Sequence, residues 1–261
     1  MNKRGRFSIS TSVFNKAYLR CAWSERNRLA PYERHGFAQF FYLTISGQLE
    51  AVISAMIKAR LASIRYMFHW DRLPPMTYTC NGEENSCSVE PLASSLLALL
   101  DATSAEAERA PYEQLCGLFS QIFSKTVSEI IGKERDQDMK ALFRLRNIFA
   151  HSREFYLEHE GLDSDHKITL EGNPLFLPAQ RLQRAGIIKH FDFTGKNHPE
   201  LQAYFYSEQA LLHFYDQVVE AETQLRNSVE FPLERGRLFL EKLPDLRDEE
   251  NELPLSEIPS K

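Results

Sequence analysis

Apolar residues recur every three to four positions along most of this chain, which is the spacing of an amphipathic helix. The longest such stretch, residues 36–70, carries its apolar stripe at nine positions: Leu49, Val52, Ile53, Met56, Ile57, Leu61, Ile64, Met67 and Phe68. This helix is expected to end before Pro74. The same spacing predicts further helices at residues 91–102, 111–132, 134–152, 199–228 and 233–242.

The remaining segments have other characters and set the predicted domain organisation. Residues 1–33 are expected to form an N-terminal arm or a short helix, and residues 71–90 a polar loop. Residues 34–243 would form one helical domain with an insertion at about 155–196, where the stretches 155–158 and 167–171 are typical of short strands. Residues 244–261 are acidic, contain proline and are predicted to be a disordered tail. The predicted fold is mainly α, with a small β-containing insertion.

Composition narrows the possible classes of protein. Hydrophobic residues make up 43% of the chain and aromatic residues 11%, which supplies a real core and excludes wholesale disorder. The net charge of −5 argues against binding nucleic acid by overall charge. If the chain handles RNA, we expect it to do so at a local site.

Cysteine usage and hydropathy favour a cytoplasmic protein. Cys21, Cys80, Cys87 and Cys116 form no C-x-x-C pair and no zinc-ligand pattern. Cys80 and Cys87 flank the polar loop and could be bridged, but reduced thiols are the preferred interpretation for a cytosolic chain. The basic N-terminus has no apolar stretch behind it, and no run of eighteen apolar residues is present. We therefore expect no signal peptide and no membrane span.

One segment, residues 141–154, combines helical spacing with an unusual arginine. On a helical wheel, Arg146 falls between Phe143 and Phe149 inside the apolar arc. A guanidinium stays charged, and burying it alone costs several kcal/mol. This position therefore favours a carboxylate, a group of carbonyls or a phosphate as its partner.

His151 lies on a different side of the same predicted helix. It shares a stripe with Arg144 and Asn147, at spacings that let side chains touch. Arg146 and His151 are separated by about 140° on an ideal wheel. They can act on one substrate only if the helix ends near His151, or if a second subunit completes the site.

The run from Arg146 through Asn147 to His151 resembles the R-x4-6-H motif of the HEPN superfamily, in its R-N-x-x-x-H form. The resemblance extends over residues 36–152 and 199–228 as core helices. It implies an all-α bundle that dimerises with the motif at the dimer interface. Many members are metal-independent endoribonucleases of toxin–antitoxin, CRISPR or phage-defence systems. RNA, a second copy of the chain and an antitoxin or defence protein are thus the implied partners, with no cofactor and no metal.

The resemblance assigns catalysis to Arg146 and His151, with Asn147 orienting His151 or holding a phosphate oxygen. Histidine moves protons near neutral pH, and arginine stabilises the extra negative charge of a phosphorane. Arg144 also lies at R-x6-H spacing from His151, so the functional arginine is ambiguous; Asn147 directly after Arg146 favours Arg146. Arg144 and Arg153 are candidates for substrate binding, against the competing interpretation of ordinary surface charge.

Three interpretations compete with this one. Arg146 and His151 could be a structural arginine and a histidine that stabilises a helix end. The chain could be a non-catalytic HEPN-like module that binds RNA, nucleotide or a partner protein, or a plain helical scaffold. A polar cluster in the insertion could suggest a metal, but a solvated turn explains it better; it comprises Glu158, His159, Asp163, Asp165 and His166.

Overall fold

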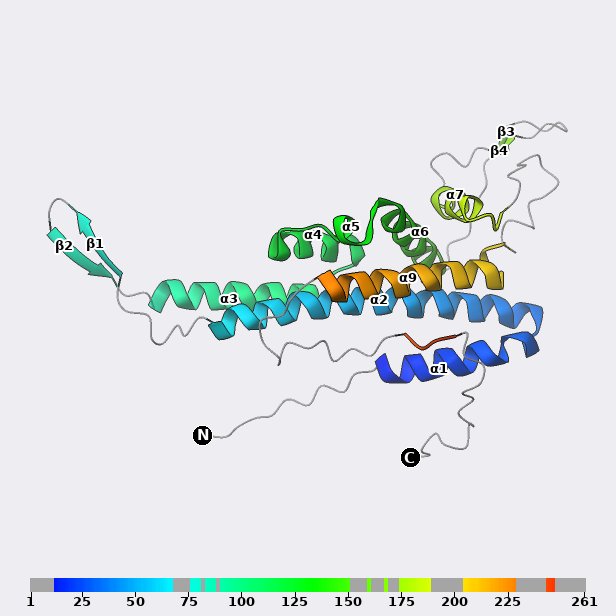
Figure 1. The fold of residues 1–261 in the computed structure, drawn as a ribbon, viewed down its shortest axis with the longest axis horizontal. Coiled ribbons are helices and arrows are strands. Elements are labelled where there is room, and N and C mark those ends of the chain that lie inside the picture. The colour runs from blue at the N-terminus through cyan, green and yellow to red at the C-terminus, as the bar shows by residue number, and fades with distance from the viewer. Residues whose placement is uncertain are drawn as a thin grey trace, which may run out of the picture. The chain divides into compact units, whose positions relative to one another are not determined.

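In a computed structural model of the chain, the described residues fold mainly into helices, as predicted (Figure 1). The structure describes residues 12–67, 76–80, 83–87, 90–150, 159–160, 167–168, 174–188, 204–228 and 243–246. The chain forms two compact units. The first consists of Met1–Gln48, Gln137–Glu220 and Glu241–Lys261, and the second of Leu49–Asp136 and Ala221–Leu240.

The described part of the first unit includes all or part of five long helices and a short 3-10 turn. These are α1 (Ser12–Glu25), η1 (Arg26–Arg28), the start of α2 (Pro31–Met67), most of α6 (Lys133–Ala150), α7 (Phe176–Arg184) and most of α9 (Glu208–Ser228). Its core includes Leu19, Trp23, Phe41, Ile45, Leu142, Leu145, Phe214 and Val218. Part of the segment predicted as an arm or short helix is thus a helix, α1, whose Leu19 and Trp23 are buried.

The described part of the second unit contains the rest of α2, a hairpin, three further helices and the remaining parts of α6 and α9. The hairpin strands are β1 (Met76–Cys80) and β2 (Glu83–Cys87), and the helices are α3 (Glu90–Ala107), α4 (Tyr112–Phe123) and α5 (Val127–Ile131). The predicted stripe of α2 is confirmed as core at six of its nine positions, because Leu49, Val52, Ile53, Met56, Ile57 and Leu61 are all buried. Ile64 is half-buried, and the side chains of Met67 and Phe68 lie outside the described part of the structure.

The single helix predicted over residues 111–132 is wrong. Helix α4 ends at Phe123, and Ser124 adopts a left-handed conformation with φ of 55°. The next helix begins with a capping box, in which Thr126 Oγ1 accepts from the Glu129 amide and Glu129 accepts from the Thr126 amide. The cap supplies partners that a broken helix needs, so α4 and α5 are separate.

The loop predicted over residues 71–90 contains an antiparallel hairpin instead. Cys80 pairs with Glu83 across Asn81-Gly82, a dipeptide that favours the tight turns of two-residue hairpins. Cys87 pairs with Met76 at the other end of the hairpin. Four residues of strand separate Cys80 from the position opposite Cys87, about 13 Å. That distance exceeds what a disulfide can span, so this register does not allow a Cys80–Cys87 bridge.

The predicted insertion at about 155–196 contains a helix that the sequence pattern did not reveal. Helix α7 occupies Phe176–Arg184 and buries Ala179 and Leu182. Two-residue strands β3 (His159–Glu160) and β4 (Lys167–Ile168) pair antiparallel within the same segment. Residues 155–158, 161–166, 169–173 and 189–196 of this segment lie outside the described residues.

Helix α9 starts at Glu208, after a break in the helix expected from Pro199; Tyr204 and Phe205 are helical before the break, and residues 199–203 lie outside the described residues. The chain turns at Tyr206 and Ser207, and Ser207 Oγ accepts a hydrogen bond from the Ala210 amide. At the far end of the chain, Leu243 and Leu246 are buried, and the Tyr215 hydroxyl donates to the Pro244 carbonyl. The first residues of the predicted acidic tail therefore pack against the first unit. The helix predicted over residues 233–242 lies outside the described residues.

No membrane span is expected from the sequence, and α2 is the helix to compare with that expectation. Its stretch Glu33–Arg65 is long and apolar enough to cross a membrane by length and composition alone. More than half of the most apolar window is buried inside the structure, as in the core helix of a soluble protein, which passes the same test. Length and composition alone are therefore weak evidence for a span.

Candidate functional site

Arg146 lies near the end of α6, four residues before Ala150, and is half-buried as its place in the apolar arc predicted. Its guanidinium carbon lies 6.0 Å from the centre of the Phe143 ring, within reach of a weak cation–π contact. Its Nη1 donates to Asn147 Oδ1 over 3.2 Å. The motif arginine is therefore held at the end of α6 by an aromatic face and a neighbouring amide.

The other candidates of the motif segment are distributed differently. Arg144 and Asn147 are exposed on α6. His151 and Arg153 lie outside the described residues, because the description of α6 extends to Ala150. The structure therefore brings together Arg146 and Asn147 among the predicted site residues. The amide expected to serve His151 or a phosphate makes its contact with Arg146.

The apolar arc of α6 is covered within a single chain. Leu142, Phe143, Leu145 and Ile148 are all buried in the first unit. An apolar arc left exposed on α6 would need a second subunit to cover it. Because the arc already has an intramolecular partner, it gives no reason of its own to expect a second subunit.

Phe149, inside the motif segment, belongs to a stack of four rings. It lies 5.5 Å from the Tyr42 ring at 19°, and 5.7 Å from the Tyr206 ring at 33°. Tyr206 in turn stacks on the exposed ring of His35, with 4.3 Å between centroids and 26° between planes. The stack therefore runs from the buried Tyr42 to the molecular surface at His35.

Hydrogen bonds fix two members of this ring stack. The Tyr42 hydroxyl donates to the Phe205 carbonyl over 2.7 Å, and burial raises the pKa of Tyr42 far above its usual value. Burial also raises the pKa of Tyr206, outweighing a hydrogen bond with Gln39 that acts in the opposite direction. Both phenols stay neutral at ordinary pH, so the stack is an uncharged, anchored aromatic surface.

A second cluster on α6 is charged and almost sealed. Arg181 of α7 donates from Nε to Asp138 Oδ1 over 2.7 Å and from Nη2 to Asp138 Oδ2 over 2.9 Å. His213 Nε2 of α9 lies 3.4 Å from Asp138 Oδ1. Asp138 is 4% exposed and Arg181 is 6% exposed. This bidentate pair, with His213 beside it, joins three helices of the first unit.

The partners of Asp138 decide its charge. Burial opposes ionisation and would raise its pKa, but the hydrogen bonds and positive charge supplied by His213 and Arg181 hold the pKa below its usual value. The carboxylate is therefore ionised at neutral pH. An ionised carboxylate that accepts two hydrogen bonds from Arg181 is suited to holding α7 against α6.

Sequence reasoning missed this charged cluster, although one signal was available. Asp138 falls on the same helical face as Leu142, Leu145 and Phe149, so a carboxylate stands in an apolar stripe. Such a residue needs a buried partner. Its identity, Arg181, could not be found because the pair is 43 positions apart and α7 itself was not predicted.

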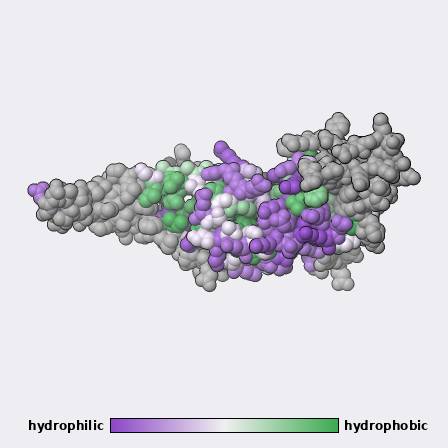
Figure 2. Space-filling view, turned by 90° about the horizontal axis from the view of Figure 1, so that it is seen from above, coloured by the Kyte–Doolittle hydropathy of each residue, from purple (hydrophilic) through white to green (hydrophobic). Residues whose placement is uncertain are grey.

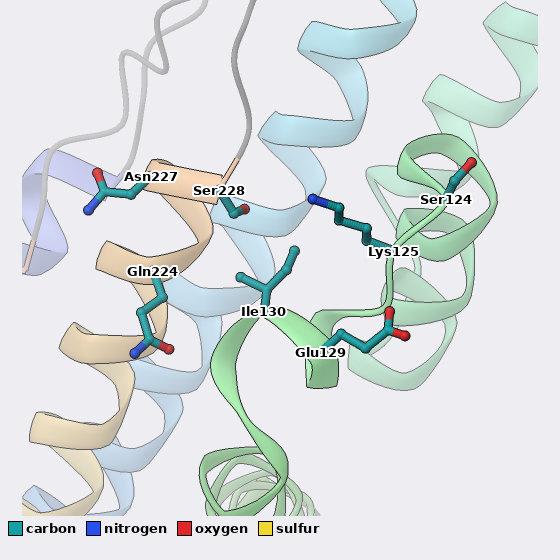
Figure 3. Close-up of a pocket in the computed structure, with 7 residues that line it drawn as sticks. All are labelled: Ser124, Lys125, Glu129, Ile130, Gln224, Asn227 and Ser228. Carbon is teal, nitrogen blue, oxygen red and sulfur yellow. The ribbon is translucent and has the colours of Figure 1, made fainter.

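A pocket opens in the second unit, away from the motif segment in sequence (Figure 3). It is lined by Ser124, Lys125, Glu129, Ile130, Gln224, Asn227 and Ser228. Glu129 is engaged in the capping box, and Gln224 Oε1 accepts from Arg135 Nη1 over 2.7 Å. No predicted site residue lines this pocket, and its carboxylate has a structural role.

The last two features concern metal ligands and an exposed hydrophobic area. Within the described residues, no group of three or more His, Cys, Asp or Glu side chains lies close enough to hold a metal ion. The polar cluster weighed as a metal site falls almost wholly outside those residues. Figure 2 shows a hydrophobic area over α3, where Leu99 is 61% exposed and Leu96 is 36% exposed. Leu96 and Leu99 are not residues of the motif.

No protein-family model, curated protein or solved structure matches this chain.

Proposed function

We propose that this chain is a metal-independent endoribonuclease of the HEPN type, with Arg146 and His151 as its catalytic residues. The placement of Arg146 carries the proposal. Its guanidinium lies near the end of α6, half-buried against Phe143 and hydrogen-bonded to Asn147, five residues before His151 in the sequence. The mainly helical fold is compatible with the bundle that the motif resemblance implies.

The proposed reaction uses the ribose 2′-hydroxyl as the nucleophile. This oxygen attacks the adjacent phosphorus and forms a 2′,3′-cyclic phosphate, while the bond to the 5′-oxygen of the next nucleotide breaks. The proton leaves the 2′-hydroxyl, and one is delivered to the departing 5′-oxygen; His151 handles proton transfer. Arg146 stabilises the negative charge on the phosphorane oxygens. The Asn147 amide would keep the Arg146 fork in one orientation.

A cleavage assay tests the reaction. Full-length protein is incubated with single-stranded RNA and with its deoxy analogue, with and without EDTA. We expect RNA cleavage that survives EDTA, leaves a cyclic phosphate and spares the deoxy strand. His151→Ala should lower the rate by about 10²–10⁴-fold. Arg146→Lys should also lose rate, because a point charge does not replace a bidentate fork.

Two variants on α6 separate the roles of its cations. Arg144→Ala should affect the rate less than Arg146→Ala, and Lys140→Ala, a change of an exposed cation on the same helix, serves as the matched control. If Arg144→Ala were the inactivating change, the reaction would stand and the arginine assignment would be wrong. Activity that needs a divalent ion, or that cuts the deoxy strand equally well, would falsify the mechanism.

An RNA-binding module without cleavage is the second candidate function. The observation that favours it is the ring stack, because Phe149 of the motif segment leads through Tyr206 to the exposed His35. Aromatic surfaces bind single-stranded nucleic acid by stacking without any catalytic group. In the cleavage assay this function would appear as RNA that is bound but not cut.

The proposal extends to a biological role and to an assembly state. As a toxin or phage-defence effector, the chain would slow growth when expressed, and His151→Ala would relieve the effect. Dimerisation enters only through the family resemblance, since the apolar arc of α6 is buried within one chain. Light scattering over micromolar concentrations tests it, and a strict monomer would count against a site completed by a second subunit.

A further inference from the structure

We infer that the exposed face of His35, stacked on Tyr206, is a binding platform for one base of single-stranded RNA. This inference rests on the proposed function, because it takes RNA as the ligand, and it names how that ligand is held. The part of the ligand that this platform would recognise is the flat face of a nucleobase. Stacking of this kind tolerates all four bases, so we expect affinity rather than sequence selectivity from it.

The geometry of the outer pair supports a stacking role. The rings of His35 and Tyr206 lie nearly parallel, at 4.3 Å and 26°. His35 is exposed, while Tyr206 is half-buried beneath it. A base placed on the outer face of the imidazole would extend an existing stack by one ring. The arrangement thus offers a flat aromatic face to solvent.

The platform is fixed before any ligand arrives. Tyr206 rests on Phe149 and forms a hydrogen bond with Gln39. Phe149 stacks on Tyr42, whose hydroxyl is anchored to the Phe205 carbonyl. A preorganised surface loses little conformational freedom on binding, which favours affinity. Four other aromatic side chains of the first unit are buried in the core: Phe41, Phe205, Phe214 and Tyr215.

Local charge around His35 suits a phosphate backbone, although the whole chain is acidic. Residues 20–35 carry four arginines against two glutamates. Arg34 is exposed, whereas Arg28 is paired with Glu25 at 2.8 Å and Arg26 with Glu208 at 2.7 Å. Counting Glu208, four arginines stand against three glutamates, so the local charge is slightly positive beside the aromatic face, a combination that single-stranded nucleic-acid sites use.

The position of the stack links it to the proposed catalytic segment. Phe149, its third ring, lies between Arg146 and His151 in the sequence. A strand held at His35 would therefore be held by rings that continue into the motif helix. The alternative is a purely structural role, in which His35 only shields the Tyr206 ring from water. The experiment must separate these two roles.

A fluorescence titration does so. The probe is a single-stranded RNA of about ten nucleotides that contains one 2-aminopurine, whose emission falls when the base stacks. The protein is the full-length His151→Ala variant, which should not cut the probe. We expect quenching on binding, and His35→Ala in this background should abolish much of it and weaken binding about 5- to 100-fold.

Matched variants isolate the ring. His35→Phe keeps an aromatic face and should retain quenching, whereas His35→Gln keeps polarity without a ring and should behave like His35→Ala. Tyr18→Ala removes another exposed aromatic of the first unit that is not part of the stack, and should leave binding unchanged. Thermal melting of each variant verifies that it is folded.

The outcomes separate this inference from the nuclease proposal. The platform would be rejected if binding and quenching were the same in His35→Ala and in its His151→Ala parent. It would also be rejected if none of the folded variants bound RNA. RNA cleavage by the wild-type chain could still be found in the first case. Conversely, binding that depends on the His35 ring without cleavage by the wild type would sustain the platform and reject the nuclease.

Discussion

Helix α6 contributes to two clusters that differ in what they expose. Asp138, near its start, lies in the sealed charged cluster with Arg181 and His213. Phe149, near its end, lies in a ring stack that opens to the surface at His35. In the charged cluster both members of the ion pair are buried, whereas the stack is buried at one end and exposed at the other.

The difference indicates which cluster stabilises the fold and which is available for binding. A buried ion pair is held by mutual neutralisation, and removing one partner leaves a charge in an apolar environment. An aromatic stack has no such requirement, so its outermost ring can be removed without stranding a charge. We therefore expect the charged cluster to act on stability and the outer end of the stack to act on ligand binding.

The largest expected effect is on the charged cluster. Arg181→Met leaves Asp138 buried without its bidentate partner and should cost about 3–5 kcal/mol of unfolding free energy. Urea denaturation of the two proteins measures the loss. A loss below about 1 kcal/mol would mean that water or another group compensates Asp138, and the contrast between the two clusters would fail.

A double variant serves as its control. Asp138→Leu combined with Arg181→Met replaces both charges with apolar side chains and should recover most of the loss, because an apolar pair avoids the desolvation of two ions. The coupling between the single changes should therefore be strong. Additive effects of the two changes would contradict the assignment of a paired cluster.

Acid should weaken the same cluster. Because the folded-state pKa of Asp138 lies below the ordinary value of 3.8, its contribution to stability is fully present above pH 3.8. The contribution is lost as the pH falls through the lower folded-state pKa. Urea midpoints measured from neutral pH downward should fall more steeply for the wild type than for the Asp138→Leu/Arg181→Met variant. Parallel curves would show that Asp138 is not held ionised by its partners.

The inner end of the ring stack should behave like part of the core. Tyr42→Phe keeps the ring against Phe149 but removes the hydrogen bond to the buried Phe205 carbonyl. We expect a cost of about 1–2 kcal/mol, because the carbonyl loses its partner. The measurement is the urea midpoint, with the RNA affinity as a second readout. An unchanged midpoint would mean that this hydroxyl does not anchor the stack.

The sequence predicted the helices well where one apolar stripe controls burial. In α2, the stripe from Leu49 to Leu61 is core, because regular spacing and burial describe the same face. The break between α4 and α5 was missed because apolar residues continue on both sides of it. The capping pattern from Thr126 to Glu129 was present in the sequence, and it was outweighed by periodicity.

The candidate site was predictable only in its local part. The half-burial of Arg146 follows from helical periodicity, since three and four residues separate it from its apolar neighbours. The pairing of Asp138 with Arg181 and the stacking of Phe149 on Tyr42 and Tyr206 join residues far apart in the sequence. Such contacts depend on how helices pack, which a single sequence pattern does not encode.

The smallest expected effect on stability is at the exposed end of the stack. His35→Ala removes one surface ring and should change the unfolding free energy by about 0.5 kcal/mol, similar to other surface substitutions. The same change should weaken binding of single-stranded RNA far more than Tyr18→Ala does, although Tyr18 is also an exposed aromatic side chain. Chemical denaturation and RNA titration of both variants make the comparison. If His35→Ala costs as much stability as Tyr42→Phe and leaves RNA binding intact, the outer ring is part of the core. The two ends of the stack would then be alike, and the distinction between a sealed cluster and an open one would no longer separate stability from binding.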